Sequence, residues 1–286
     1  MLSLPHGRPS RTALRVAERR AAHQVLDQPP VFEDPYAVRI LGAAGEKVSA
    51  GSAGLQDPVS RAFRAFMAVR SRYAEDRLAA AVARGVRQYV VLGAGLDTFA
   101  YRNPHAELGL RVFEVDHPAT QAWKRELVEA AGIAAPPALT YAPVDFERQE
   151  LGDGLRRAGF RTGEAAWFGW LGVTPYLTEE AFLATVGFIA FMPRSSGVVF
   201  DYAVSPSSLK PLERVAVAAL ARRVAAAGEP FKLFFEPRDL ADRLSRMGFT
   251  DIEDLGSEEI NARYFEDRTD GLRVRGGVGR LLSAHV

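Results

Sequence analysis

The sequence predicts an α/β protein with one seven-stranded, mostly parallel sheet, helices on both faces, a helical N-terminal extension and an inserted helical lid. Two observations carry this prediction. Short, continuous apolar runs alternate with segments of helical spacing, which is typical of a parallel sheet covered on both faces. Most of these runs stop at a glycine or an aspartate, residues that are depleted in strands.

The expected strands follow one another in a regular order along the chain. Apolar runs predict strands at residues 89–92, 110–115, 139–144, 165–171, 198–200, 251–255 and 277–283. Helical spacing predicts the intervening helices at residues 119–131, 151–158, 179–192 and 237–247. This alternation indicates that consecutive strands join one sheet through helices.

The N-terminal part of the chain reads as helices that precede the sheet. Apolar residues at helical spacing predict a helix over residues 11–26. Asp34-Pro35-Tyr36 can begin a second, short helix, because proline suits the first helical position. Several glycines predict a mobile loop over residues 43–54. Residues 58–84 then form one long helix or two consecutive ones.

These elements divide the chain into four stretches. We expect a helical cover, the core of the sheet, an inserted helical lid, and a C-terminal part that completes the sheet, at residues 1–85, 86–202, 203–235 and 236–286 respectively.

Composition excludes several classes of function. The 286 residues are enough to bury a core without disulfides or metals. A net charge of +1 gives no electrostatic case for a nucleic-acid or membrane partner. The lack of cysteine excludes thiol chemistry, Cys-ligated zinc and iron–sulfur clusters, and it fits a cytoplasmic location. Neither a leader nor a membrane span is recognisable. No His, Asp or Glu residues have metal-ligand spacing, so we expect no metal.

A glycine-rich turn follows the first expected strand. In open α/β sheets ligands bind beyond the carboxyl ends of the strands, and glycines let a ligand approach the backbone. Gly93-Ala94-Gly95-Leu96-Asp97-Thr98 occupies that place. It is either a ligand-binding loop or a tight turn without a ligand. The dinucleotide motif does not fit, because its third glycine is replaced by Thr98.

Carboxylates stand at the ends of the next two strands. Glu114 and Asp116 point to the same face of their strand and can accept hydrogen bonds from two ribose hydroxyls. Asp116 can instead cap the helix that Pro118 begins. Asp145 can accept from an adenine amino group while Phe146 packs on the ring, or it can cap a helix. Spacing alone leaves these alternatives open.

Several ordered motifs resemble one known family. They are Arg70-Ser71-Arg72-Tyr73, Gln88-Tyr89-Val90-Val91-Leu92-Gly93-Ala94-Gly95-Leu96-Asp97-Thr98, Ala100-Tyr101-Arg102, Phe113-Glu114-Val115-Asp116, Val144-Asp145-Phe146 and Gly172-Val173-Thr174-Pro175-Tyr176-Leu177. Together they resemble the leucine carboxyl methyltransferase family, and more closely its bacterial O-methyltransferase branch, over roughly residues 11–284.

The resemblance implies a class I methyltransferase fold, which is Rossmann-like, with S-adenosyl-L-methionine as cofactor and S-adenosyl-L-homocysteine as product. It implies that Arg70 binds the methionine carboxylate as a bidentate partner. Gly93, Ala94, Gly95 and Asp97 are then the turn beneath the methionine moiety.

The adenosine moiety has its own implied partners. Asp116 is expected to hold the ribose, and Asp145 with Phe146 the adenine. His117, the neighbour of Asp116, either packs on the adenine face or is an ordinary loop residue.

One position departs from the family pattern. The family has Glu-Gly after the fourth strand, where this sequence has Leu171-Gly172. In the family that glutamate accepts from the ammonium of the methionine moiety. Losing such a charged hydrogen bond costs about 1.5–3 kcal/mol, or roughly 10- to 100-fold in affinity. We expect a backbone carbonyl near Gly93 or Leu171 to take over this contact.

Acceptor-side candidates are Arg20, Tyr176 and Tyr202. The arginine suits a carboxylate, and the alternative, which the sequence favours, is a solvated charge on the helix face. The two tyrosines follow expected strands at the binding edge, as catalytic or substrate-binding groups or as half-buried packing residues.

Three hypotheses follow for the function. The first is an S-adenosyl-L-methionine-dependent O-methyltransferase acting on a carboxylate of a small molecule, such as a secondary metabolite, or of a peptide. A carboxylate is ionised at neutral pH and needs no general base, whereas a phenol or alcohol, the second hypothesis, does. The few base candidates favour the carboxylate. The third is a protein that retains the fold with lost or altered chemistry, suggested by Leu171.

Overall fold

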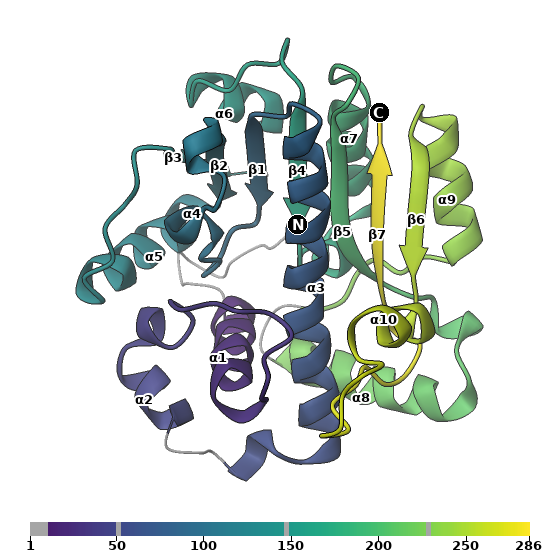
Figure 1. Cartoon of the computed structure of the whole chain (residues 1–286). Coiled ribbons are helices and arrows are strands. Elements are labelled where there is room, and N and C mark those ends of the chain that lie inside the picture. The colour runs from purple at the N-terminus through teal and green to yellow at the C-terminus, as the bar shows by residue number, and fades with distance from the viewer. Residues whose placement is uncertain (1–10, 50–52, 146–148, 227–229) are drawn as a thin grey trace.

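The computed structural model describes residues 11–49, 53–145, 149–226 and 230–286. At its centre is a seven-stranded sheet in the order β3-β2-β1-β4-β5-β7-β6 (Figure 1). The strands are β1 Gln88–Leu92, β2 Arg111–Asp116, β3 Leu139–Pro143, β4 Ala166–Trp170, β5 Gly197–Ala203, β6 Thr250–Leu255 and β7 Gly279–His285. β7 runs antiparallel to both of its neighbours, and the other strands are parallel to one another. The predicted fold class is confirmed.

The strand order places a binding crevice beside β1. Chain order runs outward from β1 to β2 and β3 on one side, and resumes with β4 and β5 on the other. Gln88 of β1 pairs with Arg111 of β2 and with Ala166 of β4. Ligands of open α/β sheets bind at such a reversal, beyond the carboxyl ends of the strands.

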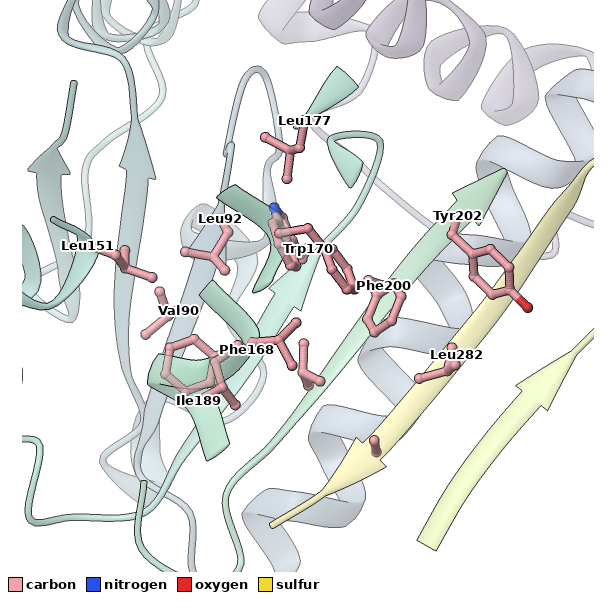
Figure 2. Packing of buried hydrophobic residues seen from close by; sticks show 14 of the residues in the cluster. Val90, Leu92, Leu151, Phe168, Trp170, Leu177, Ile189, Phe200, Tyr202 and Leu282 are labelled. Atoms are coloured by element: carbon pink, nitrogen blue, oxygen red, sulfur yellow. The ribbon is translucent and has the colours of Figure 1, made fainter. Parts of the chain in front are cut away.

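Alternating side chains of the central strands feed two hydrophobic clusters. Val90 and Leu92 of β1 belong to the cluster drawn in Figure 2, which also contains Phe168 and Trp170 of β4. Tyr89 and its alternating partner Val91 pack in the cluster on the opposite face. Both faces of the sheet are therefore covered, which explains why these strands read as continuous apolar runs.

The helices surround this sheet. The α-helices are α1 Arg11–Leu26, α2 Ala43–Ser49, α3 Pro58–Ala83, α4 Phe99–Arg102, α5 Pro118–Ala130, α6 Leu151–Arg157, α7 Glu179–Ala190, α8 Pro211–Ala226, α9 Pro237–Arg246 and α10 Ser257–Tyr264. The short 3-10 turns are η2 Arg39–Leu41, η3 Ala53–Leu55, η4 Ala106–Leu108, η5 Thr174–Tyr176 and η6 Pro206–Ser208. None of the described helices is long and apolar enough to cross a membrane.

The two faces are covered by different helices. α6, α7 and α9 contribute to the cluster of Figure 2, whereas α3, α4 and α10 contribute to the cluster on the other face. The 26-residue α3 crosses in front of the sheet in Figure 1 and extends from there toward α1 and α2. It begins at Pro58, after Asp57 accepts hydrogen bonds from the backbone of Val59 and Ser60. α3 therefore packs on the sheet and also supports the N-terminal helices.

The expectation of a mobile loop over residues 43–54 was wrong where the structure describes it. Residues Ala43–Ser49 form α2 and Ala53–Leu55 form η3. Gly45, which the sequence suggested was a loop residue, lies inside α2. A glycine is needed at this position because a Cβ would come within 2.2 Å of the carbonyl oxygen of Val38. The glycine serves close packing between two segments, and Val48 is buried on the same short helix.

A second difference lies between the last two strands. No element was predicted for this segment, but α10 spans Ser257–Tyr264 and buries Ile260 completely. The segment is short and polar, so its periodicity gives little signal. Glu259 accepts from the backbone N–H of Gly256 at 2.8 Å, which helps to start the helix.

The two ends of the expected insertion after β5 lie next to each other. Val204 and Phe235 form an isolated parallel bridge, and Ser205 N donates to the carbonyl of Phe235 at 2.9 Å. Between them lie η6 and α8. The backbone N–H groups of Lys232 and Leu233 donate to the carbonyl of Pro175 in the turn after β4. The insertion is thereby joined to that turn.

A buried polar group joins α1 to α3. His23 accepts from the backbone of Val31 through Nε2, so its Nδ1 donates to Asp27 at 2.9 Å. Arg64 of α3 makes two hydrogen bonds to the same carboxylate, at 2.6 and 2.7 Å. Burial opposes ionisation of Asp27, but Arg64 and His23 outweigh it and lower its pKa to about 2. The N-terminal helices are therefore held by an ion pair and not only by apolar packing.

Asp27→Asn should lower the free energy of unfolding by roughly 2 kcal/mol at pH 7, because the shift from 3.8 to about 2 favours the folded, ionised form. Since the folded-state pKa is depressed, this contribution is present above pH 3.8 and disappears as the pH falls through about 2. Urea unfolding of both proteins across this range measures it. Asp153→Asn, in an exposed pair with Arg156, is the matched control. A constant difference between wild type and Asp27→Asn from pH 7 to pH 2 would contradict the assignment.

Candidate functional site

The glycine-rich turn joins the carboxyl ends of β1 and β2. The backbone N–H groups of Gly93 and Ala94 donate to the carbonyl of Val115, at 2.8 and 3.1 Å. Gly95 N donates to Asp116 Oδ2 at 2.5 Å, and His117 N donates to Asp116 Oδ1 at 2.7 Å. The Asp116 carboxylate is thus oriented by two backbone donors. Burial raises its pKa above the ordinary value, although both donors and Lys124 act in the opposite direction.

The two glycines of the turn are required by their surroundings. Gly93 has a φ of +66° and Gly95 a φ of +47°, a region that other residues rarely adopt. A Cβ at Gly93 would lie 2.4 Å from Val173 Cγ2, and one at Gly95 would lie 3.2 Å from Ala13 Cβ. α1 and the turn after β4 therefore approach this backbone from two sides.

Two adjoining cavities meet at this turn. The larger cavity, of about 530 Å³, lies at the ends of β1 to β4 and between α6 and α7. The smaller, of about 110 Å³, extends from the turn toward α1 and α3. Both are lined by Leu92, Gly93, Asp116, His117 and Val173. A ligand held at Asp116 can therefore extend into both cavities.

An ion pair that the sequence analysis did not foresee lies beside the smaller cavity. Arg70 of α3 lines this cavity and donates to Asp201 Oδ2 of β5 at 2.9 Å. Each of the two residues is 5% exposed. Asp201 Oδ1 accepts from the backbone of Gly172 at 2.5 Å. Asp201 was visible as the end of an apolar run, but its partner is 131 positions away, so spacing could not reveal the pair.

Leu171 lies at the position where the family pattern has a glutamate. It lines the smaller cavity and packs against the cluster that contains Val91. The following Gly172 has a φ of +72°, and a Cβ there would meet the Arg70 guanidinium at 2.9 Å. Gly172 thus leaves room for Arg70, and the carboxylate that contacts both residues is Asp201 of β5.

Arg20 also lines the smaller cavity, but its guanidinium already has several partners. Nη2 donates to the carbonyl of Leu96 at 2.7 Å, Nη1 to Asp97 at 3.4 Å, and Nε lies 3.5 Å from Asp34 Oδ2. Thr98 donates to the same carboxylate of Asp34 at 2.6 Å. These contacts hold α1 and the segment around Asp34 against the turn after β1. Burial opposes ionisation of Asp97, but Arg20 helps to lower its pKa below the usual value.

Glu114 does not join Asp116 at the cavities. Its side chain is fully buried between β2 and α5, where Lys124 Nζ donates to Oε2 at 2.7 Å. Burial raises its pKa to about 7, and Lys124 opposes that rise. Its second oxygen, Oε1, has no hydrogen-bond partner among the described residues. Of the two carboxylates on this strand face, only Asp116 lines the cavities.

The remaining expected residues fall into two groups. His117 lines both cavities, Asp145 lines the larger and Tyr176 lines the smaller. His117 Nδ1 accepts from the backbone of Ala119 and caps α5. Phe146 lies outside the described residues. Tyr202 lines neither cavity, because its hydroxyl donates to Asp254 of β6 at 2.7 Å within the hydrophobic cluster of Figure 2.

The structure thus brings Arg70, Gly93, Asp116 and Leu171 to one pair of cavities together with Ala94, Gly95 and Asp97. Neither cavity is lined by a described residue of the insertion at 203–235. No three His, Asp or Glu side chains in the described part of the chain are grouped to hold a metal ion.

Comparison with protein families decides the assignment of the chain. Residues 13–190 match the model of the leucine carboxyl methyltransferase family. The chain belongs to this family. The predicted resemblance is confirmed.

Two bacterial relatives agree with this result. The Bacillus subtilis protein YktD, whose name assigns it provisionally to the S-adenosyl-L-methionine-dependent methyltransferases, is 36% identical over 204 residues. The match covers 71% of this chain and 67% of YktD. A protein of Mycobacteroides abscessus with the same provisional name is 37% identical over 174 residues, or 59% of this chain and 56% of that protein. The chain therefore spans between half and two thirds of these relatives.

Solved structures show the same fold at lower identity. A provisionally assigned methyltransferase from Thermobifida fusca has a TM-score of 0.56 and 17% identity, covering 91% of this chain and 98% of that one. A duf574 family protein from Streptomyces avermitilis has a TM-score of 0.54 and 16% identity, covering 93% of this chain and 96% of its own. The family and the fold are therefore those of S-adenosyl-L-methionine-dependent methyltransferases.

The two cavities fit S-adenosyl-L-methionine as cofactor. Asp116 offers a carboxylate at the end of β2, Gly93 lines both cavities, and Gly95 lines the smaller one. Arg70 supplies a cation among the residues that line the smaller cavity. We expect Asp116 to hold the ribose, the larger cavity to hold the adenine near Asp145, and the smaller to hold the methionine moiety.

Asp116→Asn should raise the dissociation constant of S-adenosyl-L-homocysteine by about 10- to 100-fold, because charged hydrogen bonds to the ribose are lost. Isothermal titration calorimetry measures the change. Glu179→Gln, which alters an exposed pair with Arg243, is the control and should bind like the wild type. An unchanged dissociation constant for Asp116→Asn would show that the ribose is held elsewhere.

Arg70→Met and Asp201→Asn should each lower the free energy of unfolding by about 3 kcal/mol, because each leaves a buried charge without its partner. The double variant should lose about 2–3 kcal/mol less than the sum of the two, since it leaves neither charge behind. Urea unfolding of the four proteins gives this coupling. Additive losses would mean that Asp201 does not hold Arg70 in place.

Proposed function

We propose that the protein transfers the methyl group of S-adenosyl-L-methionine to a carboxylate oxygen of a small molecule, of the kind found in secondary metabolism, or of a peptide. One observation carries this choice of acceptor. The described acidic and imidazole side chains that line the smaller cavity are already engaged: Asp97 with Arg20, Asp116 with two backbone donors, and His117 as the cap of α5. None is held ready as a general base. A carboxylate acceptor, already ionised at neutral pH, needs none.

The family supports the same acceptor chemistry, because its description names carboxyl methylation. The bound cofactor supplies an electrophilic methyl group on a sulfonium. A carboxylate can displace that group directly, so the protein contributes mainly by alignment of the two reactants. Side chains held in fixed positions around the cavity can provide this alignment.

The walls of the smaller cavity are suited to that alignment. α1 contributes Thr12, Ala13 and Val16, which close the cavity against the glycine turn. Tyr176, held between the end of β4 and Phe231 of the insertion at a ring distance of 5.3 Å, forms another wall. In this proposal these residues orient the acceptor, and Arg20 adds positive charge near its carboxylate without leaving its own partners.

The remaining parts of the proposal concern the cellular setting. The near-neutral net charge supports a small acceptor, recognised by one or two local arginines, and offers no basis for a nucleic-acid or membrane partner. The absence of cysteine supports a cytoplasmic location.

Incubation with candidate carboxylic acids, candidate phenols and isotopically labelled cofactor should yield a product heavier by one labelled methyl group from an acid. Mass spectrometry detects it. Because the product is an ester, mild alkali should release the label as methanol, whereas an aryl or alkyl ether would keep it. An alkali-stable product from a phenol would replace the carboxylate by a hydroxyl acceptor. Tight cofactor binding without any product would indicate altered chemistry.

A further inference from the structure

Tyr89 has a hydroxyl that the fold leaves without a partner. The residue lies on β1, is 4% exposed and lines the smaller cavity. Its phenolic oxygen has no hydrogen bond among the described residues, and its one ring contact is with Phe99. The oxygen is not one of the fully enclosed, unpartnered atoms of the described residues, so it is open to the cavity and can serve a ligand or an ordered water there.

Neighbouring residues fix the direction of this hydroxyl. The ring of Phe99 packs edge-on at 5.0 Å on one side. On β4, Gly169 leaves room for the oxygen, because a Cβ at this position would lie 2.2 Å from Tyr89 Oη. Both Gly169 and Tyr89 line the smaller cavity, together with Arg70 and Ser71 of α3. The phenol and the guanidinium of Arg70 therefore line one small cavity, of about 110 Å³.

The chemistry of these residues suits an anion. Arg70 lines the cavity with a guanidinium that Asp201 pairs through Nη1, whereas Asp201 itself does not line the cavity. Leu171 contributes none of the negative charge that a glutamate would bring. Burial raises the pKa of Tyr89 well above its usual value, so the phenol is protonated and can donate at neutral pH. A neutral donor beside a guanidinium matches a carboxylate better than an ammonium group.

We propose that Tyr89 Oη donates a hydrogen bond to the carboxylate of the methionine moiety of S-adenosyl-L-methionine, beside Arg70. This makes Tyr89 a cofactor-binding residue on a strand that otherwise reads as plain core. The inference rests on the expectation that Arg70 binds the same carboxylate. It does not depend on which acceptor the protein methylates.

Tyr89→Phe tests the inference, because it removes only the oxygen and keeps the ring against Phe99. Its dissociation constant for S-adenosyl-L-homocysteine should rise about 10-fold or more, as expected for a lost hydrogen bond to a charged group. Decarboxylated S-adenosyl-L-homocysteine, which retains the ammonium, should bind the variant and the wild type equally. Isothermal titration calorimetry measures both ligands without any acceptor.

Tyr73→Phe is the matched control. Tyr73 is a buried tyrosine of the same hydrophobic cluster, but its hydroxyl bonds to Glu253 and Ser283, and it lines neither cavity. Its variant should bind both ligands like the wild type. Thermal unfolding of each variant checks that the fold is retained.

Three outcomes would overturn the inference. The first is unchanged binding of S-adenosyl-L-homocysteine by Tyr89→Phe. The second is an equal loss for both ligands, which would assign the hydroxyl to the ammonium or to the shape of the cavity. The third is wild-type protein that binds the decarboxylated ligand as tightly as the complete one. A failure to find a methylated product would leave the binding result standing, so the proposed acceptor and this inference fail separately.

Discussion

The contact between the Asp116 carboxylate and the backbone N–H of Gly95 is the interaction on which the site depends. It joins the end of β2 to the turn after β1, and the same turn also bonds to the carbonyl of Val115. Because the carboxylate is held by backbone groups, its position does not depend on any flexible side chain. α1 and Val173 pack against the glycines of this turn, and the turn therefore helps to determine the shape of both cavities.

Around this contact, buried charges are used in pairs that join distant segments. Arg64 and Asp27 join α3 to α1, and Arg70 joins α3 to β5 through its aspartate. Lys124 joins α5 to β2 through Glu114. Each pair costs desolvation, and removing one partner is more damaging than never having had either. α3 takes part in two of them, which explains how one helix can serve both the sheet and the N-terminal cover.

The sequence predicted what depends on local pattern. Apolar runs located the strands, and the glycine turn with Asp116 located the site, because both signals lie within a few consecutive residues. Other features depend on the fold. Glu114 and Asp116 share a strand face, and only the position of Lys124 on α5 decides that the first is buried in an ion pair. Asp201 of β5 pairs with an arginine of α3 that is 131 positions away. Tyr89 lies within an apolar run. Neither role could be recognised without the three-dimensional fold.

Gly169 is as important for the position of the phenol as Tyr89 itself. Its lack of a Cβ is what allows a phenol to lie across β4, so the two positions act as one unit although they belong to different strands. A relative that carries any larger residue at the first position has to carry a smaller one at the second. Covariation of this glycine with a tyrosine 80 positions earlier in the chain would therefore mark which members of the family bind their cofactor in this way.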